Sequence, residues 1–206
     1  MDQLPPNHHG DNNAKFGGPI GYLCALTMTI GRRGDGKLVT KLANVTANDH
    51  VLDIGCGPGT AVRIAASTGA TVTGVDPAQP MLQMARLLTK IRPPTGTTEW
   101  IHAGCEDIPA PDDTYSVCWS LASVHHWPNL DAGLTEVRRV LRPGGRFIAL
   151  EKQSPPGADG LASHGWAPDQ ADRFAAILHD FGFELGQVEN HHHGRRKVVT
   201  VSSVLT

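Results

Sequence analysis

Hydrophobic residues along this chain form two kinds of run, and the two kinds alternate. Short continuous apolar runs predict buried strands, whereas apolar residues spaced three and four apart predict helices with one face turned to a core. The strand-like runs lie at residues 51–54, 71–76, 98–102, 115–122, 146–151, 183–189 and 197–205. The helix-like runs lie at residues 35–46, 60–68, 79–91, 131–141 and 168–181. This alternation predicts an α/β fold.

The links between the runs predict how the strands are oriented. Strand and helix alternate up to residue 181, which favours parallel neighbours. The last two strands are joined by the short link NHHHGRR, which permits a hairpin and not a crossover. Pro143, Gly144 and Gly145 are expected to end the helix before the fifth strand. The prediction is a seven-stranded, mostly parallel sheet with helices on both faces and an antiparallel last strand.

The 206 residues suffice for one α/β domain with a full core, and the sequence shows no internal repeat. Residues 1–15 are rich in Asn, His, Gly and Pro and are expected to be mobile. Residues 16–47 are expected to form an N-terminal helical cover. Within it, residues 19–30 predict a short apolar helix that either covers a ligand or packs on the sheet. Residues 48–206 are the expected core of a single domain.

Charge and composition exclude several classes of function. The chain has 18 Lys and Arg against 20 Asp and Glu, so it lacks the basic character of nucleic-acid-binding or membrane-surface proteins. No apolar run is long enough to span a bilayer, and the polar N-terminus lacks the layout of a signal peptide. The four cysteines share no paired spacing such as CxxC, which favours reduced thiols. We therefore expect a cytoplasmic protein that binds neither nucleic acid nor membrane.

The most informative stretch is VLDIGCGPGT at residues 51–60. An apolar strand runs into a turn with three glycines, and a helix-forming stretch begins at Thr60. A glycine-rich turn between a strand and a helix lets the backbone approach a ligand closely. The next strand, TVTGVD, ends in Asp76, whose carboxylate can accept hydrogen bonds from both ribose hydroxyls of a nucleoside. Together these features predict an adenosine-type cofactor at the edge of a parallel sheet.

The glycine spacing separates two classes of nucleoside-binding sheet. Dinucleotide dehydrogenases use G-x-G-x-x-G, whereas this turn reads G-x-G-x-G and its sixth position is Thr60. Asp53 lies on the strand two residues before the first glycine. Its charge would repel a pyrophosphate but can hold an ammonium group or brace the turn. The site therefore suits a zwitterionic nucleoside that carries an amino acid better than it suits NAD.

Four motifs then follow one another in order over about residues 48–150. They are VLDIGCGPG, GVDPAQPML, AGCEDIPAPDDTYSVCWSLASVHHW and LTEVRRVLRPGGRFIALE. In this order and spacing the chain resembles the class I S-adenosylmethionine-dependent methyltransferases, in particular their small-molecule branch (methyltransferase type 11, similar to enzymes of ubiquinone biosynthesis). The resemblance implies a Rossmann-like fold, S-adenosyl-L-methionine as the cofactor and S-adenosyl-L-homocysteine as its product.

The resemblance also implies roles for individual residues. The implied cofactor-binding residues are Asp53, Gly55, Cys56, Gly57, Gly59, Asp76, Pro77, Met81, Cys105, Glu106, Asp107 and Ser120. The glycine turn and Asp53 hold the methionine end, Asp76 holds the ribose, and Ser120 lies near the transferred methyl group. Many relatives carry an aspartate that holds the adenine amino group where this chain has Gly104. Adenine contact is therefore expected to pass to backbone groups around Cys105 and Glu106.

Two histidines after the fourth strand are the candidate catalytic residues. Methyl transfer requires alignment of nucleophile, methyl carbon and sulfur, and a hydroxyl nucleophile also benefits from a base matched to neutral pH. His125 or His126 can be that base or can orient the acceptor; alternatively, the rings only bond the backbone at the start of the next helix. The loop 153–167 carries His164 and Trp166, which either face the acceptor or tie the loop down.

Three consecutive histidines, His191, His192 and His193, resemble a metal-binding tract by composition. In a strand their rings alternate faces and cannot readily share one metal, and no Cys or acidic cluster accompanies them. We therefore expect no metal and interpret the tract as an exposed hairpin link.

The sequence favours an enzyme that methylates a small molecule by direct displacement at the sulfonium methyl. A second hypothesis is a non-catalytic S-adenosylmethionine-binding module with a regulatory or scaffold role. A third, a nicotinamide dehydrogenase, is disfavoured by the glycine spacing and Asp53. The sequence specifies neither the acceptor nor whether oxygen, nitrogen or carbon is methylated. If the last strand is an exposed edge, it permits pairing between two copies, so a homodimer is compatible with the sequence.

Overall fold

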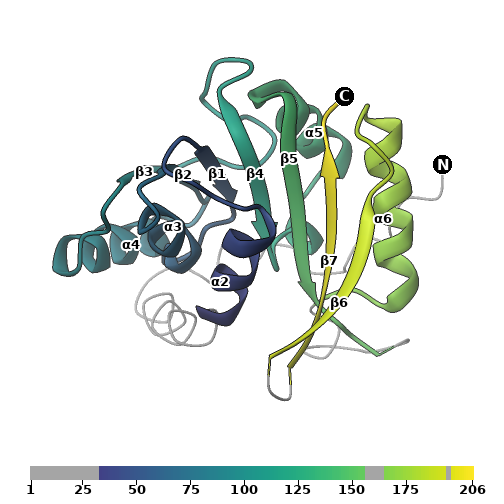
Figure 1. The fold of residues 1–206 in the computed structure, drawn as a ribbon, viewed down its shortest axis with the longest axis horizontal. Helices are drawn as coiled ribbons and strands as arrows, with labels where there is room; N and C mark the ends of the chain where they lie inside the picture. The colour runs from purple at the N-terminus through teal and green to yellow at the C-terminus, as the bar shows by residue number, and fades with distance from the viewer. Residues whose placement is uncertain (1–32, 156–164, 194–195) are drawn as a thin grey trace.

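The computed structural model describes residues 33–155, 165–193 and 196–206, and these contain one seven-stranded sheet (Figure 1). The strands are β1 (His50–Ile54), β2 (Thr71–Val75), β3 (Thr97–Ile101), β4 (Tyr115–Leu121), β5 (Leu141–Lys152), β6 (Gln187–His193) and β7 (Arg196–Val204). The helices are α2 (Arg33–Leu42), α3 (Thr60–Ala66), α4 (Gln79–Ile91), α5 (Leu130–Val140) and α6 (Pro168–Asp180), with a short 3-10 helix η2 (Val124–His126).

The sheet has the order β3-β2-β1-β4-β5-β7-β6. Pairs among β1 to β5 are parallel, and β7 is antiparallel to both of its neighbours. The predicted mostly parallel sheet with an antiparallel last strand is therefore confirmed. The chain moves outward from β1 to β3 and then returns to β4 on the other side of β1. Ligands of open α/β sheets bind beyond the carboxyl ends of the strands at such a reversal.

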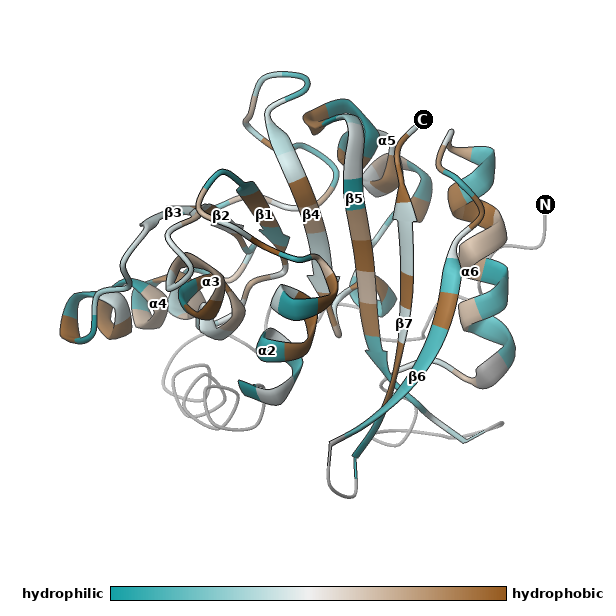
Figure 2. Ribbon diagram, in the orientation of Figure 1, coloured by the Kyte–Doolittle hydropathy of each residue, from teal (hydrophilic) through white to brown (hydrophobic). Residues whose placement is uncertain are grey.

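Helices cover both faces of the sheet, as expected. α2, α3 and α4 pack on one face through buried residues such as Val39, Val62 and Leu82. α5 and α6 cover the other face, with Leu134 and Phe174 in its core. Figure 2 shows that these helices carry both hydrophobic and hydrophilic residues, whereas the middle of β5 is largely hydrophobic. Central strands buried on both faces account for the continuous apolar runs in the sequence.

The boundary between α5 and β5 differs from the prediction. α5 ends at Val140 and β5 begins at Leu141, so the Pro-Gly-Gly sequence at 143–145 lies within the strand and not in a loop. Leu141 pairs with Tyr115, and the register then shifts before the next pair. Gly144 has φ 74°, a backbone conformation that glycine adopts without the steric cost other residues incur. The turn-forming residues therefore bend a strand instead of interrupting it.

The C-terminal hairpin begins later than predicted. Phe183 makes only an isolated bridge to Leu205, and β6 runs from Gln187 to His193. The interpretation of the histidine tract as the hairpin link is therefore wrong. These polar residues extend β6 because backbone pairing with β7 does not require apolar side chains, and His191 Nε2 lies 2.9 Å from Thr200 Oγ1. Across the described ranges, no three His, Cys, Asp or Glu side chains are placed to share a metal ion.

Several predictions fall on residues outside the described ranges. These are the mobile segment 1–15, the apolar helix 19–30 and the position of His164. Of the expected N-terminal cover, the structure describes α2, which begins at Arg33 and packs beside α3. None of the described helices has the length and apolar character needed to cross a bilayer. The organisation of residues 1–206 as a single domain stays a prediction.

Candidate active site

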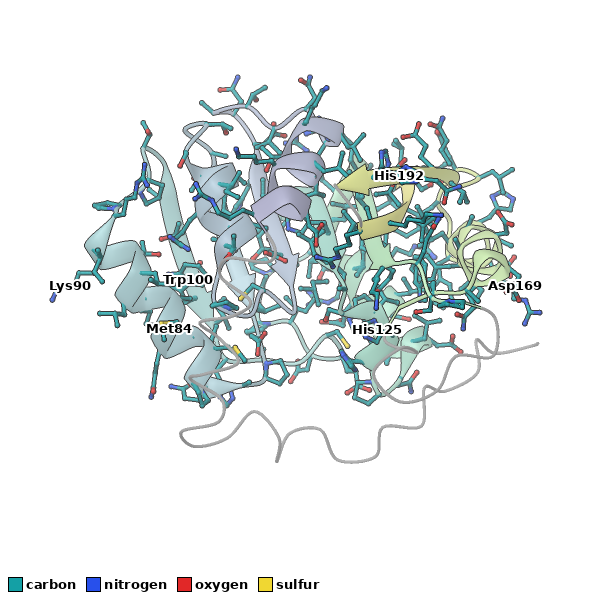
Figure 3. The ribbon with its side chains drawn as sticks, turned by 90° about the horizontal axis from the view of Figure 1, so that it is seen from below. Met84, Lys90, Trp100, His125, Asp169 and His192 are labelled. Carbon is teal, nitrogen blue, oxygen red and sulfur yellow. The ribbon has the colours of Figure 1, made fainter. Side chains whose placement is uncertain are left out.

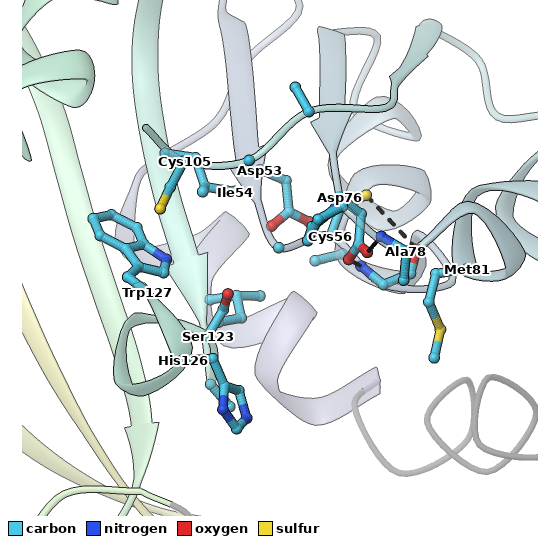
Figure 4. Close-up of a pocket in the computed structure, with 18 of the residues that line it drawn as sticks. Asp53, Ile54, Cys56, Asp76, Ala78, Met81, Cys105, Ser123, His126 and Trp127 are labelled. Carbon is cyan, nitrogen blue, oxygen red and sulfur yellow. Dashed lines mark hydrogen bonds between the residues drawn. The ribbon is translucent and has the colours of Figure 1, made fainter. Parts of the chain in front are cut away.

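A cavity of about 510 Å³ opens at the carboxyl ends of β1, β2 and β4 (Figure 4). Asp76 and Met81 lie at one end of it, and His126 and Trp127 lie at the other. Asp53 lies between the two ends. The volume is within the range of cofactor and small-molecule sites. The cavity therefore occupies the point where the strand order reverses, as the topology predicts.

The turn after β1 is held by backbone hydrogen bonds and by glycine. The N–H groups of Gly55 and Cys56 donate to the Val75 carbonyl at 2.9 and 3.0 Å. Gly55 has φ 73°, and a Cβ at this residue would lie 2.0 Å from Ser123 Oγ. Only glycine combines this left-handed backbone with so close an approach. The turn therefore presents bare backbone to the cavity.

The Asp76 carboxylate is anchored by the backbone on both sides. Its Oδ2 accepts a hydrogen bond from the Gly57 N–H and its Oδ1 accepts one from the Ala78 N–H, each at 2.8 Å. Burial raises the pKa of Asp76, and these two hydrogen bonds oppose the shift. Each carboxylate oxygen has a second lone pair and can accept another hydrogen bond. Asp76 thus joins the glycine turn to β2 and can still bind a ligand hydroxyl.

Most of the predicted cofactor residues meet at this cavity. Its lining includes Asp53, Gly55, Cys56, Gly57, Asp76, Pro77, Met81, Cys105 and Glu106, together with the predicted catalytic residue His126. Four predicted residues are absent from the lining that the described part of the chain provides: Gly59, Asp107, Ser120 and His125. Ser120 is wholly buried within the sheet. Gly59 is turned toward Trp100, and His125 toward Glu151.

The two thiols in the cavity wall are held in their neutral form. Burial, together with the carboxylates of Asp76 and Asp53, raises the pKa of the Cys56 thiol far above its ordinary value. Burial and the nearby Glu106 raise the pKa of Cys105 to about 12. A thiol is a nucleophile only as the thiolate. At neutral pH both cysteine side chains are therefore uncharged and contribute apolar surface to the cavity wall.

One feature of the cavity has no signal in the sequence. Ala122, which follows β4 and lines the cavity, has φ 49°, and its N–H donates to the Leu150 carbonyl at 2.6 Å. A non-glycine residue in this left-handed region costs about 1–2 kcal/mol, and such residues cluster at functional sites. Nothing in an alanine on an apolar strand predicts that conformation.

The two candidate catalytic histidines lie in different environments. His126 lines the cavity, whereas the His125 side chain is only 3% exposed and its Nδ1–H donates to Glu151 Oε2 at 2.8 Å. The two rings are in contact, with centroids 3.9 Å apart. Sequence reasoning missed Glu151, although an acidic residue at the end of the apolar run RFIAL was a usable signal. The structure thus connects the cavity wall to a buried carboxylate through His125.

Glu136 is a second acidic residue that was not predicted from the sequence, and it supports the segment that follows Cys105 of the cavity wall. Glu136 on α5 accepts the Ile108 N–H at 2.8 Å and is paired with Arg139 at 2.7 Å. Arg139 also donates to the carbonyls of Ile108 and Ala110 at 2.8 and 2.7 Å. The Arg139 hydrogen bond lowers the pKa of Glu136, and the same bond raises the pKa of Arg139. α5 therefore holds the segment that follows the cavity wall.

Trp166 is held beside the end of β5 by backbone hydrogen bonds. Its N–H donates to the Lys152 carbonyl and its carbonyl accepts the Ser154 N–H, each at 2.8 Å. The ring packs on Phe174 with centroids 4.8 Å apart and is 2% exposed. Trp166 is therefore part of the core and does not line the cavity.

Residues 52–149 match a protein family described as a methyltransferase domain. A demethylmenaquinone methyltransferase of Tropheryma whipplei is 36% identical over 119 residues, which are 58% of this chain and 48% of that protein. The 27-O-demethylrifamycin SV methyltransferase of Amycolatopsis mediterranei is 32% identical over 129 residues, which are 61% and 47% of the two chains. The chain thus spans about half the length of these curated relatives.

Among solved structures, a methyltransferase of Aquifex aeolicus described as SAM-dependent has the same fold. Its TM-score is 0.75 at 18% sequence identity, and the match covers 90% of this chain and 98% of that one. The fold agrees with the motif order, with the family match over β1 to β5, and with the position of the cavity. On these grounds residues 52–149 are a methyltransferase domain, and the fold around them is that of the class I S-adenosylmethionine-dependent methyltransferases.

Proposed function

We propose that this protein transfers the methyl group of S-adenosylmethionine to a small molecule bound at the His126 and Trp127 end of the cavity. The observation that supports this most directly is the shared cavity: the anchored Asp76, the glycine turn and His126 all line it. The named relatives act on demethylmenaquinone and 27-O-demethylrifamycin SV, both small molecules. Neither identifies the acceptor of this chain.

The residues of the cavity fit the cofactor by their chemistry. Asp53 suits the ammonium group of the zwitterionic methionine end, because a carboxylate attracts an ammonium group. Gly55 and Gly57 carry no side chains, so the backbone there leaves room for that end of the cofactor. Asp76 suits the ribose hydroxyls. The largely apolar wall of Pro77, Met81 and Cys105, with Glu106 beside it, suits the adenine.

The bound cofactor supplies an electrophilic methyl group on a sulfonium. The task of the protein is to align the acceptor with that methyl and to receive any proton that the acceptor loses. His126 is the candidate for the base or orienting group, because it lines the cavity. His125 is the candidate support, because Glu151 sets the orientation of its ring and that ring contacts His126. Transfer is proposed as one direct displacement.

Calorimetric titration with S-adenosylhomocysteine tests the proposed cofactor site. The wild type should bind it, and Asp76→Asn should bind at least about tenfold more weakly, because a charge-assisted hydrogen bond is lost. Asp131→Asn, a change of the same kind at an exposed residue in the first turn of α5, serves as the matched control and should leave the affinity unchanged. No binding by the wild type, or equal binding by Asp76→Asn, contradicts the proposal.

A non-catalytic binding module remains the alternative function. Methyl-labelled S-adenosylmethionine distinguishes the two. An enzyme transfers label to small molecules from a cell extract, whereas a binding module retains the cofactor unchanged. Binding of S-adenosylhomocysteine with no transfer to any small-molecule fraction would favour the binding module.

A further inference from the structure

Trp100 on β3 reaches the back of the glycine turn from the edge of the sheet. It pairs in register with Gly74 of β2, which separates β3 from β1. A Cβ on Gly74 would lie 3.0 Å from Trp100 Cζ3 and 2.8 Å from Cys56 Sγ. The missing side chain of Gly74 therefore makes room for the indole ring on one side and for the cavity-wall thiol on the other. Figure 3 shows Trp100 beside α4 and far from His125.

The same ring occupies the space that a side chain at Gly59 would need. A Cβ on Gly59 would lie 2.1 Å from Trp100 Cη2 and 3.1 Å from the Cβ of Ala85 on α4. Gly59 does not line the cavity, and its N–H donates to the Cys56 carbonyl at 3.0 Å. Glycine is thus required here by the indole ring as well as by the φ of 72°. Trp100 fills the volume behind the turn.

The end of β3 also supports the ribose side of the cavity. The Ile101 carbonyl accepts the Asp76 N–H at 3.2 Å, and the His102 ring donates to the Pro77 carbonyl at 2.8 Å. The backbone of Trp100 is itself held, because Arg86 of α4 donates to its carbonyl at 2.9 Å. β3 and the residue that follows it therefore contact both the glycine turn and the segment after β2, the two parts of the cavity wall that Asp76 connects.

We infer that Trp100 is a positioning residue for the cofactor: its ring holds the glycine turn in the conformation that binds S-adenosylmethionine, without touching the ligand. The inference rests on the proposed function of this cavity. A turn with φ positive at Gly55, Gly57 and Gly59 has many other conformations open to it, so a rigid support behind it raises affinity by preorganisation. Trp100 is half-buried, so its replacement should perturb the turn more than the core.

The test measures S-adenosylhomocysteine affinity and thermal unfolding in parallel. Trp100→Leu should raise the Kd about tenfold, because the turn loses its rigid support and must be ordered on binding. Trp100→Phe, which retains a flat ring, should restore most of the affinity. Trp166→Leu is the matched control, because Trp166 is more deeply buried and packs on Phe174 away from the turn. It should lower the unfolding temperature and leave the Kd unchanged.

A double-mutant cycle with Gly74→Ala tests the contact itself. In the wild type the added methyl meets both Trp100 and Cys56, and the Kd should rise. In the Trp100→Leu background, Gly74→Ala should raise the Kd by a smaller factor, because the added methyl no longer meets the indole ring. Three results overturn the inference: wild-type affinity in Trp100→Leu, an equal loss in Trp166→Leu, or strictly additive effects in the cycle. Failure of the wild type to bind would instead reject the proposed cofactor site.

Discussion

His125 donates its Nδ1–H to Glu151 Oε2 at 2.8 Å, and the two side chains are 3% and 0% exposed. Within the described part of the chain, the other carboxylate oxygen of Glu151 has no hydrogen-bond partner. Glu151 lies near the end of β5 and His125 lies in η2, so the pair connects two segments that are distant in sequence. The His125 ring then contacts His126 at the cavity.

Removal of the Glu151 carboxylate should destabilise the fold. Glu151→Ala leaves the His125 Nδ1–H buried without its acceptor, and we expect a loss of about 3 kcal/mol in the free energy of unfolding. Glu151→Gln retains an acceptor oxygen and should cost less. Urea unfolding followed by circular dichroism measures both. Wild-type stability in Glu151→Ala would show that the pair contributes nothing to folding.

His126→Ala should separate catalysis from cofactor binding. The ring lines the cavity and His126 is exposed, so we expect S-adenosylhomocysteine affinity within about threefold of the wild type. Methyl transfer should fall by a factor of about 10² to 10⁴, the usual contribution of a general base. The assay follows label from methyl-labelled S-adenosylmethionine into the small-molecule fraction of a cell extract. Undiminished transfer would leave His126 without a role as the base.

The residues that the sequence placed together, and that do meet at the cavity, lie close to one another along the chain. Asp53 and the glycine turn lie within one strand–turn–helix unit, and Asp76 directly follows the next strand. Spacing along the chain is enough to place such residues, because the carboxyl ends of neighbouring parallel strands meet at one edge of the sheet. The same reasoning predicted α4 with its bounds at residues 79 and 91.

The parts that were missed depend on contacts between distant segments. Glu151 and His125 are 26 residues apart, and Glu136 meets Ile108 across 28 residues. The spacing of hydrophobic residues along the chain does not indicate which distant residues form such pairs. The histidine tract was misplaced for a related reason, because its strand is formed by backbone pairing with β7 and not by an apolar pattern. Motif position alone did not place Ser120 correctly, since this residue is fully buried and does not line the cavity.

Gly104→Asp should strengthen cofactor binding. Gly104 lines the cavity, and a Cβ there would meet no neighbour nearer than the Glu106 nitrogen at 4.0 Å. The new carboxylate has room, and the family resemblance implies that an aspartate at this motif position holds the adenine amino group. A hydrogen bond to a charged group contributes about 1.5–3 kcal/mol, so S-adenosylhomocysteine should bind about ten- to a hundredfold more tightly. Gly104→Ala is the control for volume alone and should not raise affinity.

Low pH should destabilise the segment that follows Cys105 in the cavity wall, because Glu136 becomes protonated. The Arg139 hydrogen bond lowers the pKa of Glu136 below its ordinary value of 4.5, so the ionised carboxylate stabilises the fold above that value. This contribution is lost as the pH falls from the ordinary pKa through the lowered one. Between about pH 5 and pH 3 the wild type should therefore lose more unfolding free energy than Glu136→Gln, which cannot titrate there. Because Glu136 accepts the Ile108 N–H, S-adenosylhomocysteine affinity should fall over the same range in the wild type. Parallel stability curves for the two proteins would mean that Glu136 is not coupled to the fold.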